Sequence, residues 1–256
     1  MRAVISFADE RFSYLYKMLS ETGMDVTEAK TGAEFSNADT AILKYPFDSV
    51  SETGISNLHP GSRLFVLAAK PVPEEILKKF NVVSLMDDPD FVDQNALITA
   101  EGAVFCAMKR APFVLSGENI AVIGFGRIGR ALTEIFVGLH AIVTVFSRRE
   151  SGRLCAMARG AVGASVHCLP SLISDFRLIF VTSPDRMLSQ NELARVSKSA
   201  HIFDLSGAPY GVDLDAALKM GLSAKRESAL PGRYAPESAA KAMYKSIMRS
   251  LGGENL

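Results

Sequence analysis

Short apolar runs alternate along this chain with longer segments whose apolar residues recur every three or four positions. In the first ninety residues the runs predict strands at 3–7, around Val26, and at 40–43, 64–68 and 82–86. Apolar positions at helical spacing predict helices over 10–22 and 73–80. Strands that alternate with helices are typical of a parallel sheet covered on both faces. We therefore expect a small open α/β domain over residues 1–90.

An acidic stretch, Asp87–Asp90, interrupts this alternation and precedes a predicted connection over residues 91–115, whose long helix covers 91–110. A second alternation of strands and helices occupies 116–235. Its expected strands are 120–123, 141–146, 164–167, 178–182 and 202–205, and its expected helices include 129–139, 153–159 and 188–196. Residues 236–256 predict a C-terminal helix that begins at Pro236, stops at Gly252-Gly253 and packs back between the domains.

A glycine motif opens the second domain. The apolar strand at 120–123 runs directly into Gly124-Phe125-Gly126-Arg127-Ile128-Gly129 and then into a helical pattern. In this context Gly124 permits a tight turn, Gly126 leaves room for a pyrophosphate, and Gly129 lets the helix pack closely on the strand. The N–H groups at the helix start would face the phosphates. We expect all six residues to contact a dinucleotide.

The predicted fold class is therefore α/β with two domains. A Rossmann NAD(P)-binding domain is joined by the long helix to a smaller, flavodoxin-like N-terminal α/β domain.

The end of the next strand indicates which dinucleotide is bound. NAD-binding folds usually carry an acidic residue there, which bonds the ribose 2′-hydroxyl and repels a 2′-phosphate. Here the strand ends in Ser147-Arg148-Arg149, with Glu150 lying beyond it. A hydroxyl and two guanidinium groups favour a phosphate, because charge-assisted hydrogen bonds contribute about 1.5–3 kcal/mol each. We predict NADP, with NAD less favoured.

The loops after the later strands are the other places where a ligand of an open α/β sheet would lie. Thr182, Ser183 and Pro184 are expected to line the nicotinamide ribose. Asp204 could bond the cofactor amide or orient a water, or could simply cap a turn, and Ser206 after it is also expected to contact the cofactor.

Composition excludes several classes of function. Lys plus Arg and Asp plus Glu are both 28 in 256 residues, so the chain lacks the basic excess that nucleic-acid or membrane-surface binding requires. No apolar run approaches the roughly 18 residues of a membrane span, and the N-terminus does not resemble a signal peptide. Three cysteines without CxxC spacing indicate neither a disulfide framework nor a zinc site, so we expect no metal and a cytoplasmic location.

From Asp87 onward the chain resembles the A subunit of dipicolinate synthase, a sporulation enzyme of Bacillus and Clostridium relatives. The stretches that carry this resemblance are Ile98–Ala103, Leu115–Gly117, Ile120–Gly129, Phe203–Ser206 with Pro209, Gly211 and Asp213, and Leu230–Gly232 with Ala235-Pro236 and Ser238-Ala239. They span about two thirds of the chain. The N-terminal domain matches only in its strand pattern.

The resemblance implies a defined reaction, in which dihydrodipicolinate is oxidised to pyridine-2,6-dicarboxylate with NADP as acceptor. It also implies that the partner is a flavoprotein-like protein, the B subunit of dipicolinate synthase, and we expect a homo-oligomer. An aromatic product strongly favours the forward direction, so the protein mainly has to position the reactants and exclude water.

A dicarboxylate substrate calls for cationic side chains, ideally arginine. Arg233 is the first candidate, followed by Lys44 and Lys70, each just past a strand of the N-terminal domain. On the connecting helix Glu101 could be the general base or could fix the helix, and Asn95 and Thr99 share its face and are expected to contact the substrate or the cofactor.

The catalytic candidates are thus Glu101, Asp204 and Arg233. Some relatives carry an arginine just before the proline that follows the Asp-Leu strand end, whereas this chain has Ala208.

Two alternatives stay open. D-2-hydroxyacid dehydrogenases share the two-domain layout, but they use a histidine acid/base in a Pro-His turn before the last helix, and that turn here is Pro231-Gly232. None of the four histidines looks catalytic. The other alternative is a non-catalytic NADP-binding protein.

Overall fold

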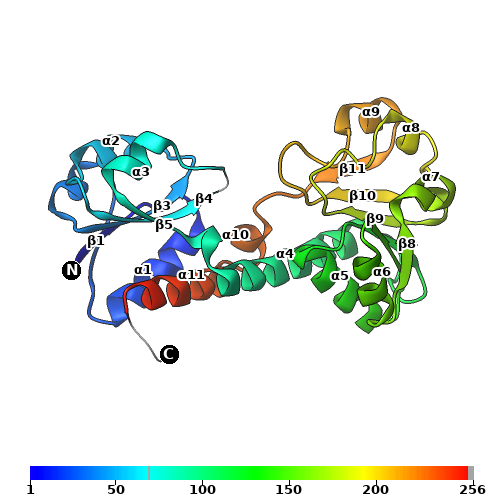
Figure 1. Ribbon diagram of the computed structural model, residues 1–256, viewed down its shortest axis with the longest axis horizontal. Helices are drawn as coiled ribbons and strands as arrows, with labels where there is room; N and C mark the ends of the chain where they lie inside the picture. The colour runs from blue at the N-terminus through cyan, green and yellow to red at the C-terminus, as the bar shows by residue number, and fades with distance from the viewer. Residues whose placement is uncertain (69, 253–256) are drawn as a thin grey trace. The chain divides into compact units, whose positions relative to one another are not determined.

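The computed structural model of the protein describes residues 1–68 and 70–252 (Figure 1). It divides into two compact units, 1–95 together with 231–256, and 96–230. The first boundary falls within helix α4 (Pro89–Arg110). The structure thus places the segment from Pro231 onward with the N-terminal strands, whereas the sequence analysis extended the second domain to residue 235. Gly253 of the predicted helix stop lies outside the described residues.

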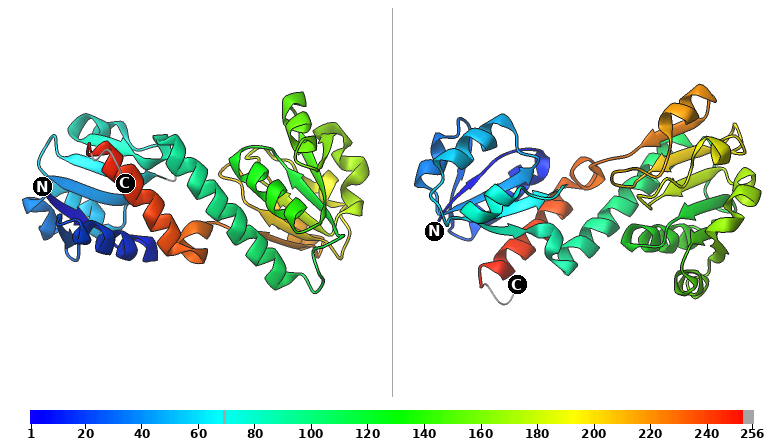
Figure 2. Two further views of the ribbon diagram at one scale, coloured as in Figure 1. Left: turned by 90° about the horizontal axis from the view of Figure 1, so that it is seen from below. Right: turned by 45° about the horizontal axis from the view of Figure 1, so that its top comes forward.

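The first unit contains a parallel sheet with strand order β2-β1-β3-β4-β5. Its strands are β1 (Arg2–Ile5), β2 (Asp25–Glu28), β3 (Thr40–Tyr45), β4 (Arg63–Ala68) and β5 (Asn81–Ser84). Its helical segments include α1 (Glu10–Glu21), η1 (Ala33–Asn37), α2 (Ser49–Asn57), α3 (Glu74–Lys79), η2 (Leu85–Asp87) and α11 (Pro236–Ser250). Helices cover both faces of the sheet, as Figures 1 and 2 show.

Alternate side chains along β1 build two separate cores. Ala3 and Ile5 pack toward α1 and α11, in a cluster that includes Phe12 and Met243. Val4 points to the opposite face and packs with η1 and α2. This division follows from the two-residue period of a strand, and it explains why nearly every position of the inner strands is apolar.

The second unit contains a parallel sheet with strand order β11-β10-β9-β6-β7-β8, which is the 3-2-1-4-5-6 order of a Rossmann fold. Its strands are β6 (Asn119–Ile123), β7 (Ile142–Ser147), β8 (Val162–Ser165), β9 (Leu178–Val181), β10 (His201–Asp204) and β11 (Ser223–Arg226). Its helical segments include α5 (Arg127–Gly138), α6 (Glu150–Met157), η3 (Val166–Cys168), α7 (Leu169–Leu172), η4 (Ile173–Asp175), α8 (Gln190–Leu193) and α9 (Leu214–Lys219). Helix α10 (Leu230–Tyr234) begins at the last residue of this unit, and its other residues belong to the first unit. The predicted two-domain α/β class with a Rossmann domain is confirmed.

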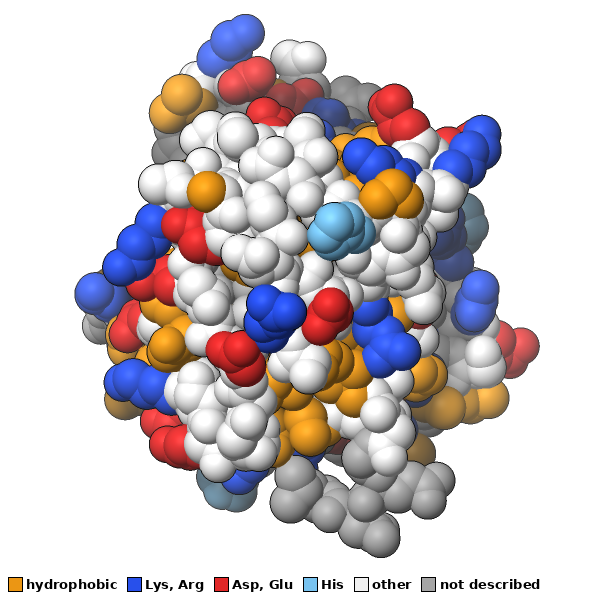
Figure 3. Space-filling view, turned by 90° about the vertical axis from the view of Figure 1, so that its left-hand side faces the viewer, with side chains coloured by type: hydrophobic (Ala, Val, Ile, Leu, Met, Phe, Trp, Pro, Cys, Tyr) orange, Lys and Arg blue, Asp and Glu red, His pale blue; other side chains and the backbone are white. Residues whose placement is uncertain are grey.

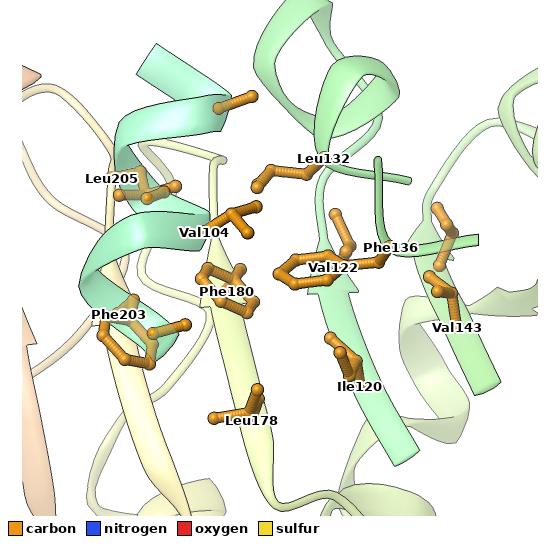
Figure 4. Packing of buried hydrophobic residues seen from close by; sticks show 14 of the residues in the cluster. Val104, Ile120, Val122, Leu132, Phe136, Val143, Leu178, Phe180, Phe203 and Leu205 are labelled. Carbon is orange, nitrogen blue, oxygen red and sulfur yellow. The ribbon is translucent and has the colours of Figure 1, made fainter. Parts of the chain in front are cut away.

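The core on one face of this sheet is aromatic at its centre. Phe180 of β9 stacks on Phe203 of β10 with ring centroids 4.9 Å apart, and it contacts Phe136 of α5 at 5.0 Å (Figure 4). Val104 of α4 packs on the same cluster. The opposite face buries the alternate strand positions under α7, α8 and α9. Two full cores fix the strands, and therefore the loops at their carboxyl ends.

Several predicted elements are wrong in extent. The strand expected at 164–167 is β8 at 162–165, and residues 166–168 form the short helix η3. The helix expected over 188–196 shrinks to α8, because Leu188 lies in a β-bridge with Val212. The sequence analysis did not identify α2, α9 or β11, which are short or carry polar residues.

Two surface properties follow from the side chains of the described residues. On the face of the first unit seen in Figure 3, acidic and basic side chains are interspersed, in keeping with the balanced composition. No helix among residues 1–68 and 70–252 combines the length and the apolar character needed to cross a bilayer.

Candidate functional site: a glycine-turn pocket in the second unit

The glycine turn between β6 and α5 has the geometry expected of a phosphate-binding loop. Gly124 has φ +103°, a conformation that L side chains rarely adopt, and a Cβ there would lie 2.6 Å from Thr182 Oγ1. A Cβ on Gly129 would lie 2.2 Å from the Gly124 carbonyl oxygen, so α5 can pack on the turn only with glycine at this position. A Cβ on Gly126 would meet open space. The turn is therefore closed at its base and open where a ligand would approach.

The start of α5 faces that open space without a side-chain cap. Gly126 is its N-cap residue and offers no side-chain acceptor to the first turn. The first N–H groups of a helix and the positive end of its dipole together favour an anion. Arg127, Ile128 and Gly129 form the first turn of α5.

A pocket of about 280 Å³ lies against this turn, entirely within the second unit. It is lined by Gly124, Phe125, Gly126, Phe146, Ser147, Arg148, Arg149, Val166, Thr182, Ser183, Pro184 and Met187. Three segments that the sequence analysis singled out separately, the glycine turn, the end of β7 and the loop after β9, thus meet in one cavity. Parallel pairing of β7, β6 and β9 brings their carboxyl ends together.

The end of β7 is held as a rigid turn. The buried Ser147 donates its hydroxyl to the Arg149 carbonyl oxygen at 3.2 Å, and a Cβ on Gly152 would lie 2.6 Å from Ser147 Oγ. Arg153 Nη1 donates to the carbonyl oxygens of Ser147 and Arg148, both at 3.1 Å. Sequence reasoning missed Arg153, because its contact depends on the turn that carries it back over the strand end.

Arg148 reaches across the pocket edge to a residue that the sequence analysis also missed. Its guanidinium pairs with Asp185 at 2.5 Å, and Ser183 Oγ donates to the same Asp185 oxygen at 3.2 Å. Both charged side chains are more than half exposed. Arg149 and Glu150 are exposed at the start of α6. The pocket therefore offers two guanidinium groups, one of them already paired.

Asp204 is fully buried at the end of β10, and both of its carboxylate oxygens are engaged. Oδ1 accepts from the backbone N–H of Ser206 at 3.1 Å and from its hydroxyl at 2.6 Å. Oδ2 accepts from Arg226 Nε at 3.2 Å. Ser206 Oγ in turn accepts from the backbone N–H of Gly211 at 2.7 Å. This network fixes the loop that follows β10.

In the first unit, Lys44 belongs to a charge cluster at the carboxyl ends of β1 and β3. Asp9, the N-cap of α1, pairs with Arg11 at 2.6 Å and with Lys44 at 3.3 Å. Burial of Asp9 opposes its ionisation, but the hydrogen bond and charge of Arg11, aided by Lys44, outweigh it and lower the pKa of this carboxyl. Sequence reasoning identified Lys44 but not its partners, which precede it by more than thirty positions.

The other predicted substrate and catalytic residues are placed as follows. Lys70 is exposed in a bend after β4, and Arg233 is exposed on α10. On α4, Glu101 is exposed, Thr99 is buried and Asn95 is half-buried. Lys44, Lys70, Asn95 and Arg233 belong to the first unit, and Thr99 and Glu101 to the second. The roles assigned to these residues stay predictions.

Comparisons with known proteins agree with this fold. No protein-family model matches the chain. The A subunit of dipicolinate synthase from Bacillus subtilis (strain 168) is 27% identical over 229 residues, which cover 88% of this chain and 73% of the relative. The crystal structure of the same type of subunit from Bacillus halodurans superposes with a TM-score of 0.86 at 22% identity, covering 98% of this chain and 97% of that one.

A D-lactate dehydrogenase from Escherichia coli shares the fold more distantly, with a TM-score of 0.69 at 15% identity over 100% of this chain and 98% of that one. In sequence and in fold, the chain is thus similar to the A subunit of dipicolinate synthase, which confirms the resemblance predicted from its residues.

Proposed function

We propose that the protein is an NADP-dependent oxidoreductase that oxidises dihydrodipicolinate to dipicolinate, as the A subunit of a dipicolinate synthase acting in sporulation. The observation that carries the proposal is the pocket in which the glycine turn, Ser147–Arg149 and Thr182–Pro184 meet. The sequence similarity to the A subunit of a dipicolinate synthase supports the choice of substrate.

The pocket fits a dinucleotide phosphate in shape and charge. Gly126 leaves the open side of the turn unfilled, as a pyrophosphate lying against backbone N–H groups requires. At the end of β7, Arg148 and Arg149 line the pocket where a selecting carboxylate would otherwise stand. Two guanidinium groups favour a ribose 2′-phosphate over a hydroxyl, so NADP is the proposed cofactor.

The reaction removes one hydride and one proton from the substrate ring. The nicotinamide, when bound, would accept the hydride with its bonding pair, while a proton leaves from a neighbouring ring atom and the electron pair it leaves behind completes the aromatic ring. The protein's task is to orient the substrate carbon and to exclude water.

We assign Asp204 to holding the loop 206–211, because both of its oxygens are engaged there. Glu101, exposed on α4, is the proposed proton acceptor, and Arg233, Lys44 and Lys70 are proposed contacts for the substrate carboxylates. The flavoprotein-like B subunit of dipicolinate synthase is the proposed partner, and the pair is expected to work as an oligomer.

The D-lactate dehydrogenase fold similarity keeps hydroxyacid oxidation as a second candidate. Against it, the turn before the last helix is Pro231-Gly232 within α10, and it carries no imidazole. Hydroxyacid chemistry needs a group there that takes the hydroxyl proton.

One assay separates these functions. The purified chain, with and without the B subunit, receives freshly generated dihydrodipicolinate and NADP⁺, and the aromatic absorbance of dipicolinate is followed together with NADPH. Equal rises in both support the proposal. Turnover of 2-hydroxyacids instead supports the second candidate, and tight NADPH binding without turnover of any substrate supports a non-catalytic NADP-binding protein.

A further inference from the structure

The loop after β10 lacks a cation of its own. Its residues 206–211 read Ser-Gly-Ala-Pro-Tyr-Gly, and none carries a charge. The adjacent strand supplies one instead. Arg226 is the last residue of β11 and lies in register with Asp204, the last residue of β10. An arginine thus stands at the carboxyl edge of the sheet, where ligands of open α/β folds bind.

Two contacts hold the Arg226 guanidinium in one orientation. Its Nε donates to Asp204 Oδ2 at 3.2 Å, and its Cζ lies 3.5 Å from the centroid of the Tyr210 ring. Asp204 is completely buried, while the Arg226 side chain is 30% exposed. The guanidinium is therefore anchored through Nε, and part of the side chain is open to solvent.

The terminal nitrogens of this guanidinium have unused donors. Among residues 1–68 and 70–252, none accepts a hydrogen bond from either terminal nitrogen of Arg226. A planar guanidinium with two free terminal nitrogens matches the two oxygens of a carboxylate, and a fixed orientation reduces the entropy lost on binding. Asp204 binds Arg226 only through Oδ2 and Nε, because its Oδ1 accepts from Ser206, so the described residues leave both terminal nitrogens of Arg226 free to bind a ligand.

The loop under Arg226 also adjoins the dinucleotide pocket. The carbonyl oxygen of Gly211 accepts from the backbone N–H of Met187 at 2.9 Å, and a Cβ on Gly211 would lie 2.6 Å from the Ser183 carbonyl oxygen. Ser183 and Met187 both line the pocket. The free edge of Arg226 thus belongs to the same rim of the sheet as the proposed cofactor site.

From this arrangement we propose that Arg226 binds one carboxylate of a small dicarboxylate substrate. The inference rests on the proposed function and adds a binding residue to it. The competing explanation is that Arg226 only neutralises the buried Asp204. A lysine would also meet that need, but it cannot present two parallel N–H donors to a carboxylate.

The test is calorimetric binding of pyridine-2,6-dicarboxylate and pyridine-2-carboxylate to the full chain saturated with NADPH. The variants are R226K, which keeps a cation beside Asp204, and R226Q. The matched control is R177Q, because Arg177 has the same kinds of contact at the opposite, amino edge of the sheet. Its Cζ lies 3.5 Å from the Phe113 ring centroid, and its Nη1 pairs with Glu118 at 2.7 Å.

We expect R226K and R226Q to bind the dicarboxylate roughly 10- to 100-fold more weakly, the range for loss of a charge-assisted carboxylate contact. The preference for the dicarboxylate over the monocarboxylate should fall in parallel, and R177Q should retain both. R226K should keep the wild-type melting temperature within a few degrees, which separates binding from folding.

Unchanged dicarboxylate affinity in R226K would overturn the assignment and leave the proposed reaction standing. A wild-type protein that binds NADPH but neither pyridine carboxylate, and does not turn over dihydrodipicolinate, would refute the reaction and the assignment with it.

Discussion

The affinity for NADPH is the property for which the pocket allows the most quantitative prediction. The perturbation is replacement of Arg148 and Arg149 by alanine, singly and together. Each guanidinium is expected to donate charge-assisted hydrogen bonds to the 2′-phosphate, worth about 1.5–3 kcal/mol. The two residues are not equivalent, however, because Arg148 is already paired with Asp185 at 2.5 Å and no described residue pairs with the Arg149 side chain.

Binding of the 2′-phosphate to Arg148 must displace or share that ion pair. Both partners are more than half exposed, so the pair is worth roughly 0.2–1 kcal/mol. The net loss in R148A is then about 0.5–3 kcal/mol, or roughly 2- to 100-fold in NADPH affinity, and R149A should cost the full contribution, roughly 10- to 150-fold. Removal of the competing carboxylate in D185A should raise NADPH affinity by roughly 1.5- to 5-fold, and should have no effect in R148A.

Fluorescence titrations with NADPH and NADH measure these affinities directly. The double variant should lose on the order of a hundredfold or more for NADPH and little for NADH. R159A is a suitable control, because Arg159 pairs with Glu134 at 2.7 Å in the same unit and does not line the pocket. Equal losses for NADPH and NADH in R148A/R149A would show that these side chains do not read the phosphate.

Three further outcomes are expected. In G129A the free energy of unfolding, measured by chemical denaturation, should fall by at least about 2 kcal/mol and NADPH binding should be lost, because the added Cβ would lie 2.2 Å from the Gly124 carbonyl oxygen. G138A, whose Cβ meets no atom within 4 Å, should be as stable as the wild type or more stable, and equal stability of the two variants would contradict this prediction. Truncation of the stacked ring in F180A should cost about 3–5 kcal/mol in chemical denaturation, and a loss below about 1 kcal/mol would contradict the aromatic core. Burial of His201, together with the charges of Arg110 and Arg177, lowers its pKa in the folded protein, so the unfolded chain binds the proton more readily. The free energy of unfolding should therefore fall as the pH drops below about 6.5, and H201Q should flatten that part of the stability-pH profile.

Local sequence was sufficient to predict the glycine turn and the inner strands. The turn is built from residues 120–129, where each glycine has its own geometric role between the apolar strand and the helix. The inner strands are buried on both faces and therefore read as continuous apolar runs. The edge strands β8 and β11 were misplaced or missed, because Val-Gly-Ala-Ser and Ser-Ala-Lys-Arg carry little of that signal.

By itself, the sequence determined the fold class, the dinucleotide-type turn and the absence of an acid at the end of β7. Only the tertiary structure decided which charged groups meet, as in Arg148 with Asp185 and Asp204 with Arg226. The members of each pair are 37 and 22 positions apart in the chain, and periodicity carries no information over such distances. Their proximity arises because crossover connections return parallel strands in register, so that carboxyl-end residues from separate segments share one rim.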